Sequence, residues 1–177
     1  MMTLVVGVPD SGKSALAESL AVEQSEGEKR IYIATMIPFG EEGQRRVEKH
    51  RKLREGKGFF TVEAPVNVAE SVKDLPEIGD ATCLLECVSN LVGNVMHEGN
   101  SEDGAVVESV VSDIRALRGL CKNLVVVTNS FPLEGEGYDD DTRRYARLIM
   151  KVNEALRGLA DKTFEYVDGE WREDERN

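Results

Sequence analysis

The segment Gly7-Val-Pro-Asp-Ser-Gly-Lys-Ser14 follows a short apolar stretch and precedes a stretch rich in Ala and Leu. Its spacing satisfies the pattern G-x-x-x-x-G-K-[ST], in which backbone N–H groups surround phosphate oxygens at a helix N-terminus. Gly12 allows close approach of the backbone, Lys13 reaches the outer phosphates, and the Ser14 hydroxyl can bind Mg²⁺. A glycine turn without chemical function is the alternative, and the flanking strand and helix argue against it. We therefore expect a nucleoside triphosphate site formed by Gly7, Val8, Pro9, Asp10, Ser11, Gly12, Lys13 and Ser14.

Strand-like and helix-like segments alternate along the rest of the chain. Continuous apolar runs, typical of strands covered on both faces, occur at Thr3–Val8, Arg30–Thr35, Phe59–Ala64, Ala81–Cys87, Leu124–Asn129 and Thr163–Val167. Helices are expected between them at Lys13–Glu23, Glu42–Arg54, Asn67–Leu75, Ser89–Met96, Ala105–Leu120 and Thr142–Leu159. This alternation predicts an α/β fold with a mostly parallel sheet and helices on both faces. Loops are expected at 36–43, 97–104 and 131–141, and the charged tail at 169–177 is expected to fray.

The composition excludes several classes of protein. The 177 residues include 22 Lys and Arg against 33 Asp and Glu, a formal net charge of −11, and suit one globular domain over residues 1–177. This acidic balance argues against a general nucleic-acid or membrane-surface binder. No apolar run approaches the ~20 residues that span a bilayer, and the N-terminus does not resemble a signal peptide. Cys83, Cys87 and Cys121 form no CxxC pair, which favours buried free thiols in a cytoplasmic protein over a disulfide framework or a zinc site.

An acidic residue ends one of the expected strands. The stretch Cys83-Leu-Leu-Glu86 places the Glu86 carboxylate at the carboxyl edge of the sheet, where it could bind Mg²⁺ beside the phosphates. The alternative is a charge at the strand end that faces water. Asn129, at the end of another expected strand, is a similar candidate with weaker support.

Basic residues gather in one short segment. Residues 45–57 hold seven of the 22 cations: Arg45, Arg46, Lys49, Arg51, Lys52, Arg54 and Lys57. In a helix, Arg46, His50 and Arg54 share one face, and this face is either solvated or a phosphate site. His50 favours the phosphate site, because neighbouring cations disfavour its charged form and a neutral imidazole can attack phosphorus. His97 lies in a polar segment and is expected at the surface.

Seven ordered stretches together are more specific than the phosphate loop alone. They are Gly7–Ser14, Tyr32–Thr35, Arg46–His50, Thr61–Glu63, Leu84–Asn94, Val125–Asn129 and Asn153–Leu156. This set resembles the bifunctional adenosylcobinamide kinase/adenosylcobinamide-phosphate guanylyltransferase family of cobalamin biosynthesis. The chain departs from the usual family pattern at Val8 and Asp10, where a glycine and an arginine are usual, and at Ser130-Phe131-Pro132, where Glu-Val-Gly is usual.

The resemblance implies a RecA-like P-loop fold, a homo-oligomer that is trimeric, and two reactions. In the first, a nucleoside triphosphate (ATP or GTP) phosphorylates the aminopropanol hydroxyl of adenosylcobinamide. In the second, GTP guanylylates His50 with loss of pyrophosphate, and the GMP passes to adenosylcobinamide phosphate. The nucleotide-binding positions implied in addition to the loop are Ala34, Thr35, Met36, Arg51, Lys52, Leu53, Arg54, Glu63 and Glu86.

Two other functions agree with the phosphate loop. A different P-loop small-molecule kinase would transfer the γ-phosphate without forming a covalent nucleotide. A noncatalytic nucleotide-binding protein would be stabilised by nucleotide without turnover.

Overall fold

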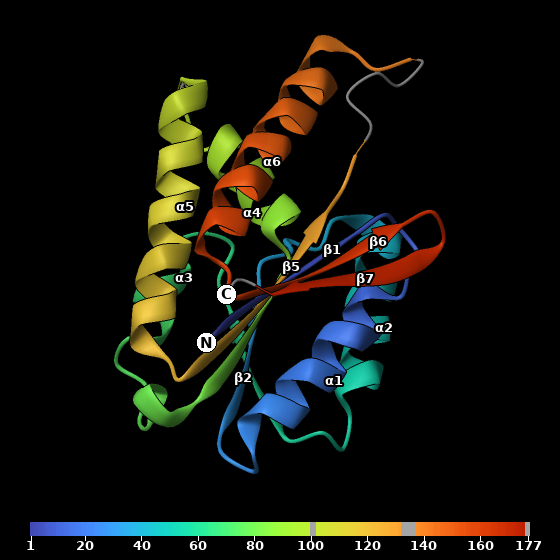
Figure 1. Cartoon of the computed structure of the whole chain (residues 1–177). Coiled ribbons are helices and arrows are strands. Elements are labelled where there is room, and N and C mark those ends of the chain that lie inside the picture. The colour runs from blue at the N-terminus through green and yellow to red at the C-terminus, as the bar shows by residue number, and fades with distance from the viewer. Residues whose placement is uncertain (100–101, 132–136, 176–177) are drawn as a thin grey trace.

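A seven-stranded sheet lies at the centre of the molecule, in the order β3-β2-β4-β5-β1-β6-β7 (Figure 1). The computed structural model describes residues 1–99, 102–131 and 137–175. The strands are β1 (Met2–Gly7), β2 (Arg30–Ala34), β3 (Phe59–Glu63), β4 (Thr82–Glu86), β5 (Asn123–Asn129), β6 (Lys162–Val167) and β7 (Glu170–Glu175). The α-helices are α1 (Lys13–Ser25), α2 (Gly40–Arg54), α3 (Val68–Val72), α4 (Val88–His97), α5 (Asp103–Leu120) and α6 (Asp140–Leu159), and a 3₁₀ turn spans Ile78–Asp80.

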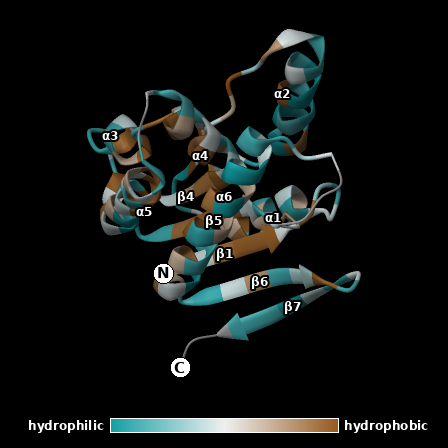
Figure 2. Cartoon of the chain, turned by 90° about the horizontal axis from the view of Figure 1, so that it is seen from above, coloured by the Kyte–Doolittle hydropathy of each residue, from teal (hydrophilic) through white to brown (hydrophobic). Residues whose placement is uncertain are grey.

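The sheet is parallel except for its last strand, and helices cover both of its faces, as the alternation predicted. Strands β1 to β6 pair in parallel, whereas β7 pairs antiparallel to β6. Side chains alternate between the faces, so Leu4 and Val6 pack under α3 to α6 while Val5 packs under α1. Figure 2 shows the resulting apolar centre in β1, β4 and β5, with hydrophilic residues on α2 and β7.

The tail prediction was wrong. Within the segment expected to fray, Glu170–Glu175 form β7, and residues 176–177 lie outside the described residues. Trp171 packs against Tyr166, with ring centroids 5.2 Å apart, and joins the apolar cluster beneath α1. The charges around Trp171 suit an edge strand, where charged side chains oppose pairing with another chain. The expected loops 97–104 and 131–141 include residues 100–101 and 132–136, which lie outside the described residues.

The carboxyl ends of the parallel strands meet at one edge of the sheet and bring distant residues together. There, Gly7 ends β1 beside Asn129 of β5, and Ala34 ends β2 between Glu63 of β3 and Glu86 of β4. Ligands of open α/β sheets bind at this edge. Among the described residues, no helix has both the length and the apolar character needed to cross a bilayer.

Candidate active site

The phosphate loop connects β1 to α1 at this edge. A Cβ at Gly7 would overlap the Ser11 hydroxyl and lie 3.2 Å from the Trp171 ring, so a larger residue would make these side chains shift. Gly12 has a φ of 82°, which favours glycine at the start of α1. Val8, Pro9 and Asp10 form the exposed crest of the loop. The loop therefore has the strand–turn–helix context that its sequence pattern requires.

Lys13 folds back over the loop. Its Nζ donates a hydrogen bond to the Val8 carbonyl oxygen at 3.2 Å. Burial lowers the pKa of Lys13, while the nearby Cys87, Glu86 and Asp10 oppose this shift. The charge of Asp10, unfavourable for phosphate by itself, thus helps to keep the ammonium group protonated.

Glu86 faces the loop, which excludes the alternative of a strand-end charge in water. Its side chain is only 8% exposed. Its Oε1 accepts a hydrogen bond from the Ser14 hydroxyl, and its Oε2 accepts one from the Tyr32 hydroxyl at 3.2 Å. Burial and the charge of Glu86 raise the pKa of Tyr32, so the phenol stays a donor. Tyr32 belongs to one of the stretches that resemble the family, but its sequence context did not predict a position in the site.

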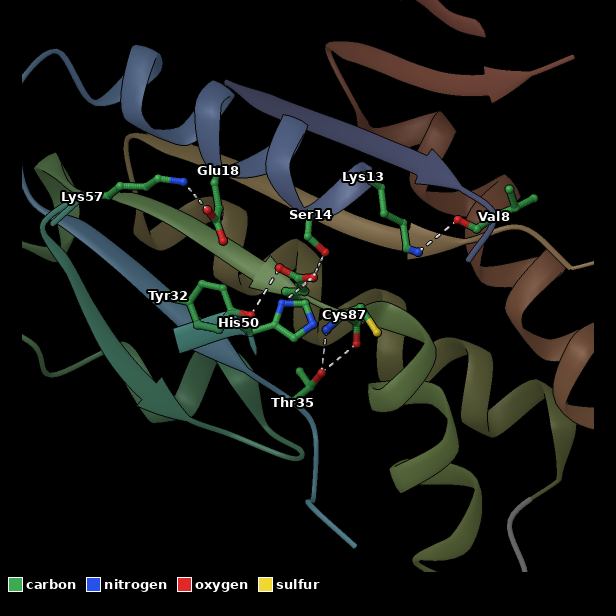
Figure 3. A network of polar contacts seen from close by, with 10 residues as sticks. Val8, Lys13, Ser14, Glu18, Tyr32, Thr35, His50, Lys57 and Cys87 are labelled. Carbon is green, nitrogen blue, oxygen red and sulfur yellow. Dashed lines mark hydrogen bonds and ion pairs between the residues drawn. The ribbon is translucent and has the colours of Figure 1, made fainter. Parts of the chain in front are cut away.

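His50 points from α2 into the same group (Figure 3). Its Nδ1 lies 3.6 Å from Oε1 of Glu86, and its side chain is 25% exposed. Among the described residues, Nδ1 has no hydrogen-bond partner. His50 therefore lies beside a carboxylate as well as among the cations of its own helix.

The rest of α2 lies over the site without a buried residue of its own. Arg54 stacks on Tyr32, with its guanidinium carbon 3.6 Å from the ring centroid. Just after the helix, Lys57 pairs at 2.7 Å with Glu18 of α1, which is fully buried. These contacts, like that of His50, are polar or cationic, so α2 is held on the sheet by charge and stacking rather than by an apolar face.

Thr35 fastens the ends of β2 and β4 together. Its Oγ1 donates to the Cys87 carbonyl oxygen and accepts from the Cys87 N–H, both at 2.8 Å. Ala34 and Met36, also expected in the site, lie on either side of it at the strand end. Burial raises the pKa of Cys87, so this thiol beside Glu86 stays neutral. The three cysteines are free, but only Cys83 is fully buried.

A cavity of about 1100 Å³ opens on the β3 side of His50. Its lining includes the three cations Arg51, Lys52 and Arg54, together with the two carboxylates of Glu55 and Glu63. Arg51 and Glu63 lie 3.9 Å apart and are both largely exposed. The predicted residue Leu53, half-buried in α2, does not line it. The surplus of cations suits an anionic ligand.

The Ser14 hydroxyl and the Glu86 carboxylate are the groups that fit Mg²⁺. Both are hard oxygen ligands, and Mg²⁺ usually binds one or two protein oxygens together with substrate phosphates. In the described ranges, no group of three or more His, Cys, Asp or Glu side chains gathers as metal ligands.

Two of three comparisons with known proteins found matches. The family profile CobU, described as cobinamide kinase / cobinamide phosphate guanyltransferase, matches residues 3–171. The ATPase domain of G40P is similar in structure, with a TM-score of 0.54 and 11% identity over 94% of this chain and 69% of that one. The flagellar accessory protein FlaH from Methanocaldococcus jannaschii aligns with a TM-score of 0.49 and 13% identity, over 97% of this chain and 75% of that one. Comparison with curated proteins finds no match.

Proposed function

The chain belongs to the cobinamide kinase/cobinamide phosphate guanyltransferase family, and we propose that it catalyses both reactions, the second through a covalent intermediate on His50. The contact of His50 with the Glu86 carboxylate, beside the phosphate loop, is the observation that supports this most directly. On a helix face exposed to solvent, a histidine would not lie beside Glu86, the residue that also accepts a hydrogen bond from Ser14.

In the kinase step, the acceptor hydroxyl oxygen forms a bond to the γ-phosphorus while the bond to the β-phosphate oxygen breaks. The nucleoside diphosphate leaves, and the hydroxyl proton passes to water. The loop N–H groups and Lys13 stabilise the charge on the transferring phosphoryl group. Mg²⁺, held by Ser14 and Glu86, would supply further neutralisation of the phosphates.

In the guanylyl step, a ring nitrogen of His50 attacks the α-phosphorus of GTP and pyrophosphate leaves. With the proton on Nδ1 directed at Glu86, the lone pair on Nε2 is free for this attack, and the carboxylate stabilises the resulting cation. The terminal phosphate oxygen of adenosylcobinamide phosphate then displaces the histidine. The phosphorus–nitrogen bond breaks, and adenosylcobinamide-GDP forms.

The cationic cavity beside α2 is the proposed nucleotide subsite. Arg51, Lys52 and Arg54 lie on its wall, within one or two turns of His50 along the same helix. Binding there would place the nucleotide phosphates between these cations and the phosphate loop.

The two steps can be separated with two variants. Purified protein is incubated with adenosylcobinamide, ATP, GTP and Mg²⁺, and the corrinoids are resolved by chromatography and mass spectrometry. We expect the wild type to form adenosylcobinamide-GDP, the His50→Asn variant to accumulate adenosylcobinamide phosphate, and the Lys13→Ala variant to form neither product. If His50→Asn forms adenosylcobinamide-GDP at the wild-type rate, the reaction does not pass through a covalent intermediate on His50. Phosphorylation of another alcohol, with no corrinoid product, would favour a different small-molecule kinase.

A further inference from the structure

A second cavity shares no lining residue with the cationic one. Its volume is about 550 Å³, and α4, α6 and the segment after β3 line it. Apolar residues (Ile37, Pro65 and Val66) line part of it, and five neutral polar side chains also face it: Ser89, Asn90, Asn94, Thr142 and Tyr145. Burial raises the pKa of Tyr145 to about 12, so this hydroxyl also stays neutral.

Hydrogen bonds connect this second cavity to the carboxyl edge of the sheet. Asn94 donates to the Thr35 carbonyl oxygen at 2.8 Å, where β2 ends beside the Glu86 strand. Ser89 accepts from the N–H of Asn129 at 3.2 Å, and Asn129 is the β5 partner of Gly7 in the phosphate loop. The cavity floor is therefore one hydrogen bond away from residues that border the phosphate site.

The two cavities differ in the balance of their charges. The described lining of the second cavity contains no Arg or Lys, and it includes His97 and the acidic residues Glu98 and Asp141. The first cavity carries three cations and the two carboxylates of Glu55 and Glu63. A nucleotide polyphosphate would be repelled by the second cavity and attracted by the first. The second cavity instead suits an uncharged ligand that exchanges hydrogen bonds with amides and hydroxyls.

We propose that the second cavity is the acceptor subsite, which binds the alcohol-bearing, amide-rich side arm of the corrinoid and presents its hydroxyl to the γ-phosphate. This inference rests on the proposed function. Cavities of ~300–1,000 Å³ enclose drug-sized ligands, so a corrinoid, which is larger, fits only by one arm. The macrocycle then lies outside, near Ile37, which lines the cavity and is 60% exposed, and Phe39, which is 92% exposed.

Two substitutions test this subsite by filling it. Asn90→Phe places a bulky ring at a half-buried position of the cavity wall. Thr142→Trp places one at an exposed position of the wall, where the core is left unchanged. Met150→Phe is the matched control, because Met150 is 44% exposed on α6 and lines neither cavity. Adenosylcobinamide binding is measured by equilibrium dialysis with visible absorbance. Covalent labelling of each protein by GTP is measured in parallel.

We expect the wild type and Met150→Phe to bind the corrinoid equally, and both filling variants to bind it at least ~10-fold more weakly, since a blocked wall removes several contacts. All four proteins should accept label from GTP to the same extent. Wild-type affinity in both filling variants, or no corrinoid binding by the wild type, would overturn the acceptor subsite. If the wild type binds the corrinoid, the filling variants do not, and no sample accepts label from GTP, the subsite stands and the proposed function fails.

Discussion

One carboxylate organises the chemistry at the residue scale. Glu86 meets the Ser14 hydroxyl, the Tyr32 phenol and the His50 ring, and each of these comes from a different element. The Ser14 and Tyr32 hydroxyls donate hydrogen bonds that orient this carboxylate, whereas Nδ1 of His50 lies 3.6 Å from it and has no hydrogen-bond partner among the described residues. In the proposed function, the same carboxylate would serve both Mg²⁺ and the imidazole.

Lys13 offers a prediction about pH. Its pKa lies below the ordinary value of 10.5 because of burial, so the ammonium group loses its proton at a lower pH than an exposed lysine. Inorganic tripolyphosphate is a suitable ligand for this test because it carries no nucleobase that titrates. Its affinity for the protein should decline as the pH rises, and the decline should begin below pH 10.5. The decline can be followed by calorimetry.

The Lys13→Met variant provides the control for this profile. It should bind tripolyphosphate roughly 10–100-fold more weakly near neutral pH, since a charge-assisted hydrogen bond contributes ~1.5–3 kcal/mol. The difference between the two proteins should shrink as the pH rises. A constant difference across the range would mean that Lys13 does not titrate there.

At the scale of elements, α2 is the unusual part of the fold. This 15-residue helix contributes no buried residue, yet it holds His50 over the sheet. Its attachment depends on the Arg54–Tyr32 stack and on Lys57, which follows the helix and reaches the buried Glu18 of α1. A helix held in this way can be released by breaking a few polar contacts.

The Lys57→Met variant should lower the free energy of unfolding by about 3 kcal/mol, because it leaves the Glu18 carboxylate buried without its partner. Urea denaturation measures this loss. Lys73→Met, which breaks only the exposed contact with Glu70, should change stability little. The double variant Lys57→Met/Glu18→Gln should recover part of the loss. Equal effects of the two lysine substitutions would show that Glu18 does not need Lys57.

At the scale of the whole molecule, the strand order decides which residues meet. The phosphate loop and the position of Glu86 could be predicted from sequence, because parallel strands align their carboxyl ends at one edge. The Tyr32 partner could not, since it depends on β2 lying next to β4. The charged partner of His50 could not either, because the local pattern of α2 gives its faces but not where it lies on the sheet. The strand that contains Trp171 could not be predicted either, because the charged residues around Trp171 are typical of a fraying tail.

The two cavities share no lining residue. The first is lined by α2, β3 and the segment between them, and the second by α4, α6 and the segments that follow β2 and β3. In the proposed function, the first cavity would hold the nucleotide and the second the acceptor, so that the two substrates meet at one phosphate site.

The central claim is that His50 becomes covalently guanylylated. The most direct test incubates the protein with Mg²⁺ and GTP carrying a radiolabel at the α-phosphate, and then measures bound label that is acid-labile and alkali-stable, as a phosphoramidate is. The matched control is Glu48→Ala, a change at an exposed position of the same helix. We predict label on the wild type and on Glu48→Ala, and none on His50→Asn. Unlabelled wild-type protein that still binds GTP would contradict the claim, as would label that persists on His50→Asn.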